Sequence, residues 1–387
     1  MKTKFPFMIL LSLFTSLVLA SCGASAQDTL KQEFIENYAN IVHASYEDSL
    51  KTALELQTAI EAFVAAPSEA NLQAAKTAWL AAREPYGQTE AYRFYGGPID
   101  DEDGPEGLLN AWPLDESYVD YVEGAPDAGI INNPADYPEI TTALLESLNE
   151  QGAEENISVG YHAIEFLLWG QDLSEDGAGN RPYTDYTDAP NAERRAAYLS
   201  AAAGLLVTHL QEMVDAWAPN VEDNYRAQFL ALDPDTALTH ILTGMGVLSK
   251  SELAGERIFT AYDNQDQEDE HSCFSDNTHR DIITNAQGIY NIYFGAYTRT
   301  DGSVVSGTGL KDLLAAVDAD LEAELTALFI STLETVNAIP APFERAIVEA
   351  DQRPLILEAV NALQSQGDKI AEAAAALGLT INTALPE

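Results

Sequence analysis

Apolar side chains recur at steps of three and four residues along most of the chain, which is the spacing of one face of an α-helix. The first series runs from Phe34 to Phe63. Pro67 and Ser68 then end this helix, and Ser68 is placed to cap a second helix that extends to Gly96-Gly97-Pro98. The pattern therefore predicts two long helices that follow each other at the N-terminal end.

Residues 97–136 have no sustained hydrophobic period. They are rich in Gly, Pro and Asp, which favour turns, but they also include Trp112, Tyr118 and Tyr121. A loop of this length inside a compact chain is usually functional or disordered, and its aromatic residues favour ordered packing. We therefore predict an ordered excursion near the functional site.

Helical periodicity returns after residue 137 and continues to the C-terminal part of the chain. Asp233 and Pro234 resemble an N-cap followed by Pro at the first helical position. A polar, acidic loop is expected over residues 263–275, and a turn and loop over residues 299–309. No stretch is typical of an extended sheet. The helices predicted here cover residues 138–152, 158–172, 191–217, 234–262, 278–297, 309–337 and 351–377.

The pattern as a whole predicts an all-α protein with long ordered loops, most simply built from two helical bundles. We assign residues 22–220 to an N-terminal bundle and residues 221–387 to a C-terminal bundle. Short motifs hint at an internal duplication, since Arg83-Glu84 and residues 90–93 resemble Glu252 and Glu256-Arg257.

The first residues resemble a targeting signal. Two lysines precede an apolar stretch that ends in Leu19-Ala20-Ser21-Cys22, as in a bacterial lipoprotein signal, although an ordinary secretory signal cut elsewhere is an alternative. We predict a signal peptide over residues 1–21, a lipid on Cys22, and export to a membrane-anchored position facing the periplasm or the cell surface. Cys273 is then the only other cysteine, so no intrachain disulfide is expected.

The charge balance is strongly acidic, with 19 basic and 62 acidic residues and a net charge of −43. Removal of residues 1–21 takes away Lys2 and Lys4 and no acid, which makes the net charge −45. Such a surface repels phosphate backbones and anionic headgroups, which argues against nucleic acid binding and against lipid adsorption without the anchor. Cations are the natural partners, although an acidic surface also serves solubility.

The segment SVGYHAIEFLLWGQD places His162 and Glu165 inside an otherwise apolar run. On a helix they share one face, close enough to ligate one metal ion or to hydrogen-bond each other. His209 and Glu212 have the same spacing but lie among polar residues, which favours a solvated stripe. A buried carboxylate at Glu165 needs an arginine, a histidine or a metal as its partner.

Gly160-Tyr161-His162-Ala163-Ile164-Glu165 matches the Gly-x-His-x-x-Glu signature of the imelysin family, a peptidase-like group. Residues 83–100, 109–121 and 270–282 resemble its iron-regulated branch, so the resemblance extends over essentially the mature chain. It implies a fold of two helical bundles with a site between them, export, and a link to iron or another metal. It leaves the chemistry open, because the family includes proteins described as metallopeptidases and others linked to iron acquisition.

Carboxylates and imidazole suit iron and manganese, so His162 and Glu165 are the main candidate ligands, either direct or orienting. His271 and His279, flanked by Glu270, Asp276 and Asp281, form the densest cluster of histidine and carboxylate in the chain. Surface charge or helix capping would equally explain the acidic candidates, and Asp276 is placed to cap the helix that follows. Further candidate ligands are Glu84, Glu90, Asp100, Asp276 and His279.

Arg83 and Arg93 are scarce positive charges that would pair with these carboxylates or hold an anionic ligand such as a chelate or a haem propionate. Haem itself is disfavoured, because the chain has no Cys-x-x-Cys-His attachment motif. The favoured function is binding of iron, a related divalent metal or an iron chelate, which is handed on to a protein partner during uptake. A metallopeptidase at the same pair is the main rival, although it needs an unidentified base, and a non-catalytic lipoprotein adaptor is the third hypothesis.

Overall fold

The structure is a computed structural model that describes residues 18–174 and 177–386, with side chains from residue 27 onward. It confirms an all-α protein, in which the described residues add only one two-stranded sheet. The predicted signal peptide falls largely on residues 1–17, outside the described residues, and the side chain of Cys22 is likewise not described. No helix in the described part of the chain combines the length and apolarity needed to cross a membrane.

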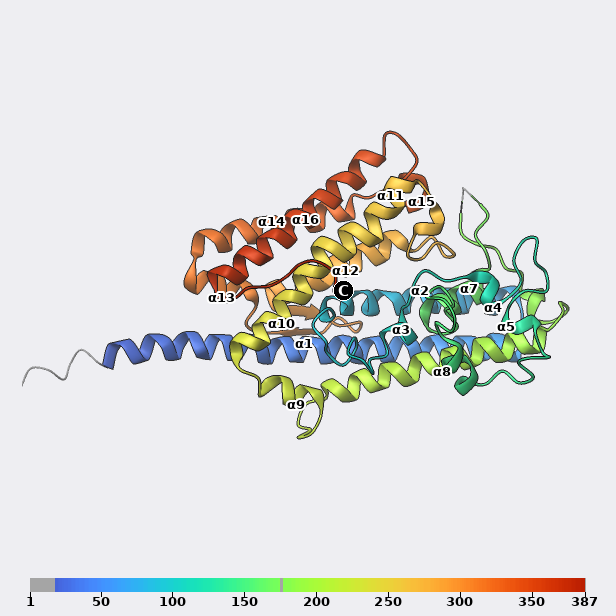
Figure 1. Ribbon diagram of the computed structural model, residues 1–387, viewed down its shortest axis with the longest axis horizontal. Coiled ribbons are helices and arrows are strands. Elements are labelled where there is room, and N and C mark those ends of the chain that lie inside the picture. Colours follow the sequence, from blue (N-terminus) through green and yellow to red (C-terminus); the bar gives the residue numbers. More distant parts are fainter. Residues whose placement is uncertain (1–17, 175–176, 387) are drawn as a thin grey trace, which may run out of the picture.

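The long helices α1 (Val18–Ala65) and α8 (Ala192–Trp217) run along the lower side of the molecule in Figure 1. α1 packs against α2 (Glu69–Thr89) and α8. The predicted cap at Ser68 is confirmed, because its hydroxyl accepts a hydrogen bond from the backbone N–H of Asn71 at 3.3 Å. α2 continues into one 3₁₀ turn, η1 (Glu90–Tyr92), and the chain then leaves the helix before Gly96.

Residues 97–136 form an ordered excursion with three short helices, α3 (Glu106–Leu109), α4 (Glu116–Val119) and α5 (Gly129–Asn132). Its main anchor is the fully buried carboxylate of Asp120, which accepts hydrogen bonds from Arg181 and Arg195 at 2.6 to 2.8 Å. The excursion is followed by α6 (Thr142–Leu148), α7 (Gly160–Trp169) and the 3₁₀ helix η2 (Tyr183–Tyr186).

The C-terminal half begins with α9 (Tyr225–Leu230) and α10 (Pro234–Val247). Asp233 caps α10, with Pro234 at its first position, as predicted. The helix expected to run unbroken to residue 262 instead changes its winding. Leu248–Phe259 form a π-helix, η3, and Thr260–Asn264 form α11. The remaining elements are η4 (Gln267–Asp269), α12 (Thr278–Phe294), α13 (Leu310–Val317), α14 (Ala319–Asn337), α15 (Phe343–Ala346) and α16 (Arg353–Ala376).

The π-helix bears directly on the site. Such a helix hydrogen-bonds residues five apart and is rare in proteins. In η3 it brings Glu252 and Arg257, five residues apart, within 2.8 Å of each other. An α-helix turns by about 100° per residue, so it would place this pair on different faces. The altered winding therefore holds both side chains toward the same region.

Two predictions of the sequence are corrected in this half. Residues 299–309 contain a strand, β2 (Val304–Ser306), which pairs antiparallel with β1 (Ala296–Thr298). Asp48 of α1 holds this hairpin through Tyr297, Arg299 and the backbone N–H of Thr300. The helix expected over residues 309–337 is two helices, because Asp318 ends α13 and caps α14 through the N–H of Leu321.

Helices from both sides of the predicted boundary pack together. α16 lies against η3, α14 and α10, and α14 and α16 lie above α1 in Figure 1. α12 packs against α2, and α10 packs against α1. The boundary at residue 220 falls between α8 and α9, and the division into two bundles stays a prediction.

Candidate functional site

α7 carries the central pair of the site and is buried along its whole length. It begins at Gly160, where φ is +86° and a Cβ atom would lie 2.7 Å from the carbonyl oxygen of Leu109. Only glycine tolerates both conditions without strain. The indole N–H of Trp79 donates to the Tyr161 carbonyl at 2.9 Å and fixes the first turn against α2. The glycine of the sequence motif is thus explained by close contact between α7 and the excursion.

His162 and Glu165 share one face of α7, as predicted, and both side chains are fully buried. Nδ1 of His162 lies 2.9 Å from Oε2 of Glu165. The other carboxylate oxygen accepts two hydrogen bonds from Ser275, one from its backbone N–H at 3.0 Å and one from its hydroxyl at 2.6 Å. Nε2 of His162 is buried and has no hydrogen-bond partner in the part of the chain that the structure describes.

Burial sets the protonation of this pair. It raises the pKa of Glu165 to about 8, although the hydrogen bonds from Ser275 oppose the shift. Burial likewise lowers the pKa of His162 well below its ordinary value, with the nearby His271 and Arg83 adding to the effect. At pH 7 the pair is therefore a neutral hydrogen bond rather than an ion pair.

A second histidine meets the first from a different element. The imidazole rings of His162 and His271 contact edge to face, with centroids 4.6 Å apart and an angle of 76° between the planes. The indole of Trp112 also contacts His162, at 5.1 Å between ring centroids. Nδ1 of His271 lies 3.4 Å from Oδ2 of Asp281. Burial, followed by the charge of Arg257, lowers the pKa of His271 to about 4, so this ring is also neutral at pH 7.

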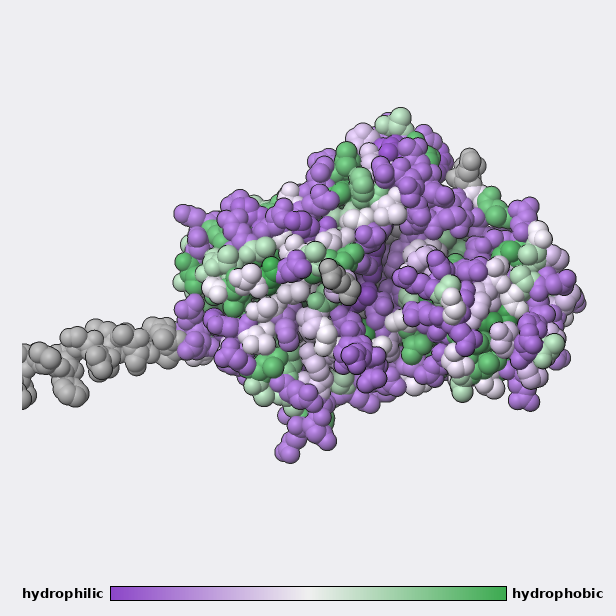
Figure 2. All heavy atoms as spheres, viewed as in Figure 1, coloured by the Kyte–Doolittle hydropathy of each residue, from purple (hydrophilic) through white to green (hydrophobic). Residues whose placement is uncertain are grey.

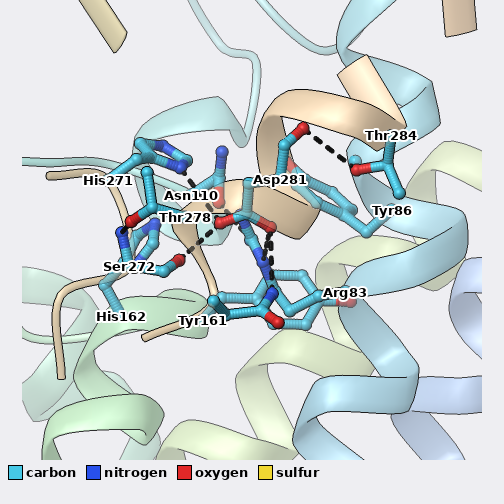
Figure 3. A network of polar contacts seen from close by, with 12 residues as sticks. Arg83, Tyr86, Asn110, Tyr161, His162, His271, Ser272, Thr278, Asp281 and Thr284 are labelled. Atoms are coloured by element: carbon cyan, nitrogen blue, oxygen red, sulfur yellow. Dashed lines mark hydrogen bonds and ion pairs between the residues drawn. The ribbon is translucent and has the colours of Figure 1, made fainter. Parts of the chain in front are cut away.

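Asp281 is the hub of a buried network, drawn in Figure 3. Arg83 donates to it through Nε at 3.1 Å and pairs with its second oxygen through Nη2 at 3.1 Å. The hydroxyl of Ser272 also donates to Asp281. Burial by itself would raise the pKa of Asp281, but Arg83 and His271 outweigh it and hold the pKa far below its ordinary range. Asp281 is therefore a carboxylate at every physiological pH.

The network continues through Asn110. Its side-chain oxygen accepts a hydrogen bond from Arg83, and its amide donates to Glu90 at 3.2 Å. Glu90 also pairs with Arg93 and Arg257, each at 2.7 Å. Burial opposes ionisation of Glu90, but Arg257 and Arg93 outweigh it and lower the pKa to about 2. The arginine and glutamate motifs that hint at duplication thus contact each other across η1 and η3.

A cleft with a volume of about 440 Å³ opens onto this network. His271 lies in its wall with Trp112, and Arg93 and Arg257 line another side. Figure 2 shows a hydrophilic hollow near the middle of one face. His162 is fully buried in contact with His271, so the pair connects the cleft to the interior.

The other predicted ligands lie apart from this pair. Glu84 pairs with Arg280 in a half-exposed bridge, and Glu90 is held by arginines. Asp100 accepts hydrogen bonds from the N–H groups of Phe94 and Gly97. In the described residues, no group of three or more His, Cys, Asp or Glu side chains is arranged to hold a metal ion.

Three further predictions are refined here. The residue at the N-cap of α12 is Asn277 rather than Asp276. His279 is half-buried with no partner for Nδ1, and it is the neighbouring His271 that contacts the motif. Arg83 and Arg93 are both engaged by carboxylates, which is the pairing role that the sequence allowed.

The second histidine–glutamate pair differs from the expected solvated stripe. His209 is 4% exposed, whereas Glu212 is exposed and lies 3.1 Å from Nδ1. The polar residues next to His209 in sequence led to the prediction of a solvated position, but the His209 ring itself is buried.

The sequence missed three participants of the site. Ser275 holds Glu165, Asp281 orients His271, and Trp112 covers His162. The first two stand in the cluster of histidine and carboxylate around residues 270–281, which was the available signal. The indole of Trp112 had only its place in a long loop to mark it.

Comparison with known proteins places these features in context. A family model described as Imelysin, of the peptidase M75 class, matches residues 42–370. Iron-regulated protein A of Synechococcus elongatus is 27% identical over 362 residues, which cover 91% of this chain and 88% of that protein. Two solved structures share the fold. A protein of Parabacteroides distasonis, described as an iron-regulated protein A precursor, has a TM-score of 0.68 at 19% identity and covers 89% of this chain and 95% of its own. An imelysin-like protein of Psychrobacter arcticum has a TM-score of 0.66 at 14% identity and covers 92% of this chain and 98% of its own.

Proposed function

The chain belongs to the imelysin family, and from that premise we propose that it binds iron or a related divalent metal, alone or in a small complex, at the imidazole pair His162 and His271. One observation carries this proposal. Each imidazole has Nδ1 against a carboxyl group, Glu165 for His162 and Asp281 for His271, so that Nε2 is the nitrogen left for a ligand.

This arrangement is the usual one around a metal-binding histidine. Such a ring donates its second N–H to a carboxylate, which fixes the tautomer and raises the basicity of the free nitrogen. The buried Nε2 of His162 has no hydrogen-bond partner among the described residues, and an unsatisfied buried polar atom costs free energy. A bound metal ion would satisfy it. In this scheme Glu165 orients His162, because both of its oxygens are already engaged.

The set of donor atoms favours a metal ion that is bound and released over one that stays bound as a cofactor. Imidazole nitrogens suit iron, copper, nickel and zinc, but a pair of them is a weak site alone. Since the described residues offer no cluster of three ligating side chains, the other coordination positions would be filled by water or by donors that arrive with the metal. Such a site would release its cargo readily.

The acidic surface and the relatives support a role in uptake. A net charge of −43 concentrates cations near the cleft, and one relative is named an iron-regulated protein. We further propose that the protein is exported and anchored through a lipid on Cys22, and that it passes iron to a protein of an uptake system. Mass spectrometry of Cys22 in the membrane fraction tests the anchor, with Cys22→Ala expected to shift the protein to the soluble fraction.

The binding test is calorimetric titration of the chain that begins at residue 22, purified without affinity histidines, with Fe(II) under anaerobic conditions and with Mn(II) and Zn(II). We expect one site, weakened at least about tenfold in His162→Gln and in His271→Gln. His43→Gln is the matched control, since His43 lies on α1 and pairs with Glu47. Equal weak binding by all four proteins would overturn the proposal and favour a structural pair in a non-catalytic adaptor.

One further assay distinguishes a metallopeptidase at the same pair from a protein that only binds and carries the metal. Hydrolysis of unstructured peptides by the metal-loaded protein, abolished in His162→Gln, would assign the site to peptide cleavage. We expect binding without hydrolysis, because both oxygens of Glu165 are engaged and no free base is thereby left at the motif.

A further inference from the structure

The cleft above His271 is larger than a hydrated metal ion requires. Six water molecules occupy about 180 Å³ at roughly 30 Å³ each. The cleft measures about 440 Å³, which is within the range of pockets that hold small organic molecules. The site therefore has room for a metal ion together with an organic ligand that completes its coordination.

The charge of the cleft selects among such complexes. Its wall carries six glutamates and one aspartate against two arginines. Both arginines are already neutralised, Arg93 by Glu90 and Glu106, and Arg257 by Glu90 and Glu252. Among the described residues, glutamates with no basic partner remain at the rim, including Glu154, Glu256 and Glu268, and all three are exposed.

One of these acids is already held unfavourably as a carboxylate. Burial raises the pKa of Glu268 to about 7, and the charge of Glu116 adds to the shift. An anionic chelate would add to this repulsion, whereas a cation would relieve it. Arg93, which the sequence offered for an anionic ligand, is already paired with Glu90 and Glu106.

An aromatic face completes the wall. Trp112 lines the cleft, is half-buried, and packs against His162 and Phe274 at 5.1 and 5.7 Å between ring centroids. An indole is the best aromatic platform for an organic cation. The cleft therefore presents an acidic rim, an indole and an imidazole in one space.

We infer that the ligand of this cleft is a metal complex of net positive charge whose organic part carries amine or similar cationic donors. The inference rests on the proposed function and names the class of its cargo. The acidic rim attracts the complex, Trp112 contacts its organic part, and the imidazole of His271 occupies a coordination position that the organic ligand leaves open.

Two nickel complexes of matched shape test the sign of the charge. Ni(II) with tris(2-aminoethyl)amine is a dication, Ni(II) with nitrilotriacetate is an anion, and both leave a pair of adjacent positions open. Calorimetric titration of the chain from residue 22 should give at least about tenfold tighter binding of the amine complex, because charges a few ångströms apart interact strongly in a partly enclosed site.

The triple variant Glu154→Gln, Glu256→Gln, Glu268→Gln should lose most of this preference. Its control is Glu55→Gln, Glu61→Gln, Glu358→Gln, which changes the net charge equally on exposed faces of α1 and α16. His271→Gln should weaken both complexes. Equal or tighter binding of the anionic complex, or equal effects of the two triple variants, would overturn the inference.

The two proposals fail in different ways. Retention of histidine-dependent binding of Fe(II), without a preference for the cationic complex, would leave metal binding intact and remove the charge selectivity. Absence of histidine-dependent binding for every metal probe would overturn both.

Discussion

The imidazole rings of His162 and His271 contact each other edge to face, with their centroids 4.6 Å apart. His162 lies on α7, whereas His271 lies on the loop before α12. Glu165 fixes the first from within α7, whereas Asp281 fixes the second from α12. The candidate site therefore exists only when these two parts of the chain are packed together.

Metal affinity should depend on pH through Glu165. Binding at Nε2 of His162 requires the proton on Nδ1 and a carboxylate at Glu165, so below a pKa of about 8 each binding event must release one proton. Affinity should rise about tenfold per pH unit toward pH 8 and level off above it. Titration in two buffers of different ionisation enthalpy measures the proton released.

Glu165→Gln provides the control for this pH dependence. The amide cannot take up or release a proton, so the slope between pH 6 and 8 should disappear while affinity falls by about 10- to 100-fold. His271, with a pKa of about 4, does not titrate in this range. A slope that persists in Glu165→Gln would assign the released proton to another group.

Arg83→Met should destabilise the protein by about 3–5 kcal/mol, because it leaves the carboxylate of Asp281 buried without its main partner. Arg83 is 2% exposed. Arg280→Met is the matched control, since Arg280 pairs with Glu84 in a bridge whose side chains are 38% and 44% exposed, and it should cost about 0–1 kcal/mol. Urea unfolding gives both values, and equal effects would contradict the role of burial.

Gly160→Ala should destabilise the protein by about 1–3 kcal/mol from its backbone conformation alone, before the contact with Leu109 is added. Gly204→Ala is the comparison. Gly204 lies inside α8, where an added Cβ has only Gln57 at 3.9 Å, so the change should stabilise by up to about 1 kcal/mol. Thermal melts of the two variants should move in opposite directions.

Glu344 should make stability fall as pH rises. Burial and the nearby Asp276 raise its pKa to about 7, and in the described residues neither of its carboxylate oxygens has a hydrogen-bond partner. A raised pKa means that the folded state binds the proton more tightly, so the stability contributed is present below about pH 4.5 and is lost as pH rises to about 7.

Glu344→Gln should flatten the decline of the melting temperature between pH 5 and 8. Glu349→Gln is the control and should leave the decline unchanged, because the Glu349 side chain is 45% exposed and pairs with Arg345. A wild-type melting temperature that stays constant or rises over this range would contradict the assignment.

The helices were predictable because their signals are local. Ser68 and Asp233 mark helix starts through their own hydrogen bonds to the next turn, and the apolar period of α1 follows from packing on α2 and α8. The strand at Val304–Ser306 was missed because it is short and is held by Asp48, far away in the sequence. The π-helix was missed because periodicity alone continues smoothly from α10.

The candidate site was predictable only in part, for the same reason. His162 and Glu165 stand three residues apart, so their contact follows from helix geometry. The contact of His162 with His271 depends on how α7 meets the loop before α12. The sequence marked that loop by its density of histidine and carboxylate, but no local rule distinguishes His271 from His279.

The number of residues in the π-helix η3 determines which side chains line the cleft. Deleting one residue between Leu248 and Phe259 would let the segment rewind as an α-helix and would carry Arg257 away from both Glu252 and Glu90. The same composition with one residue fewer would then have a different cleft. Insertions and deletions in this twelve-residue segment should therefore be tolerated less well than those in the exposed loops.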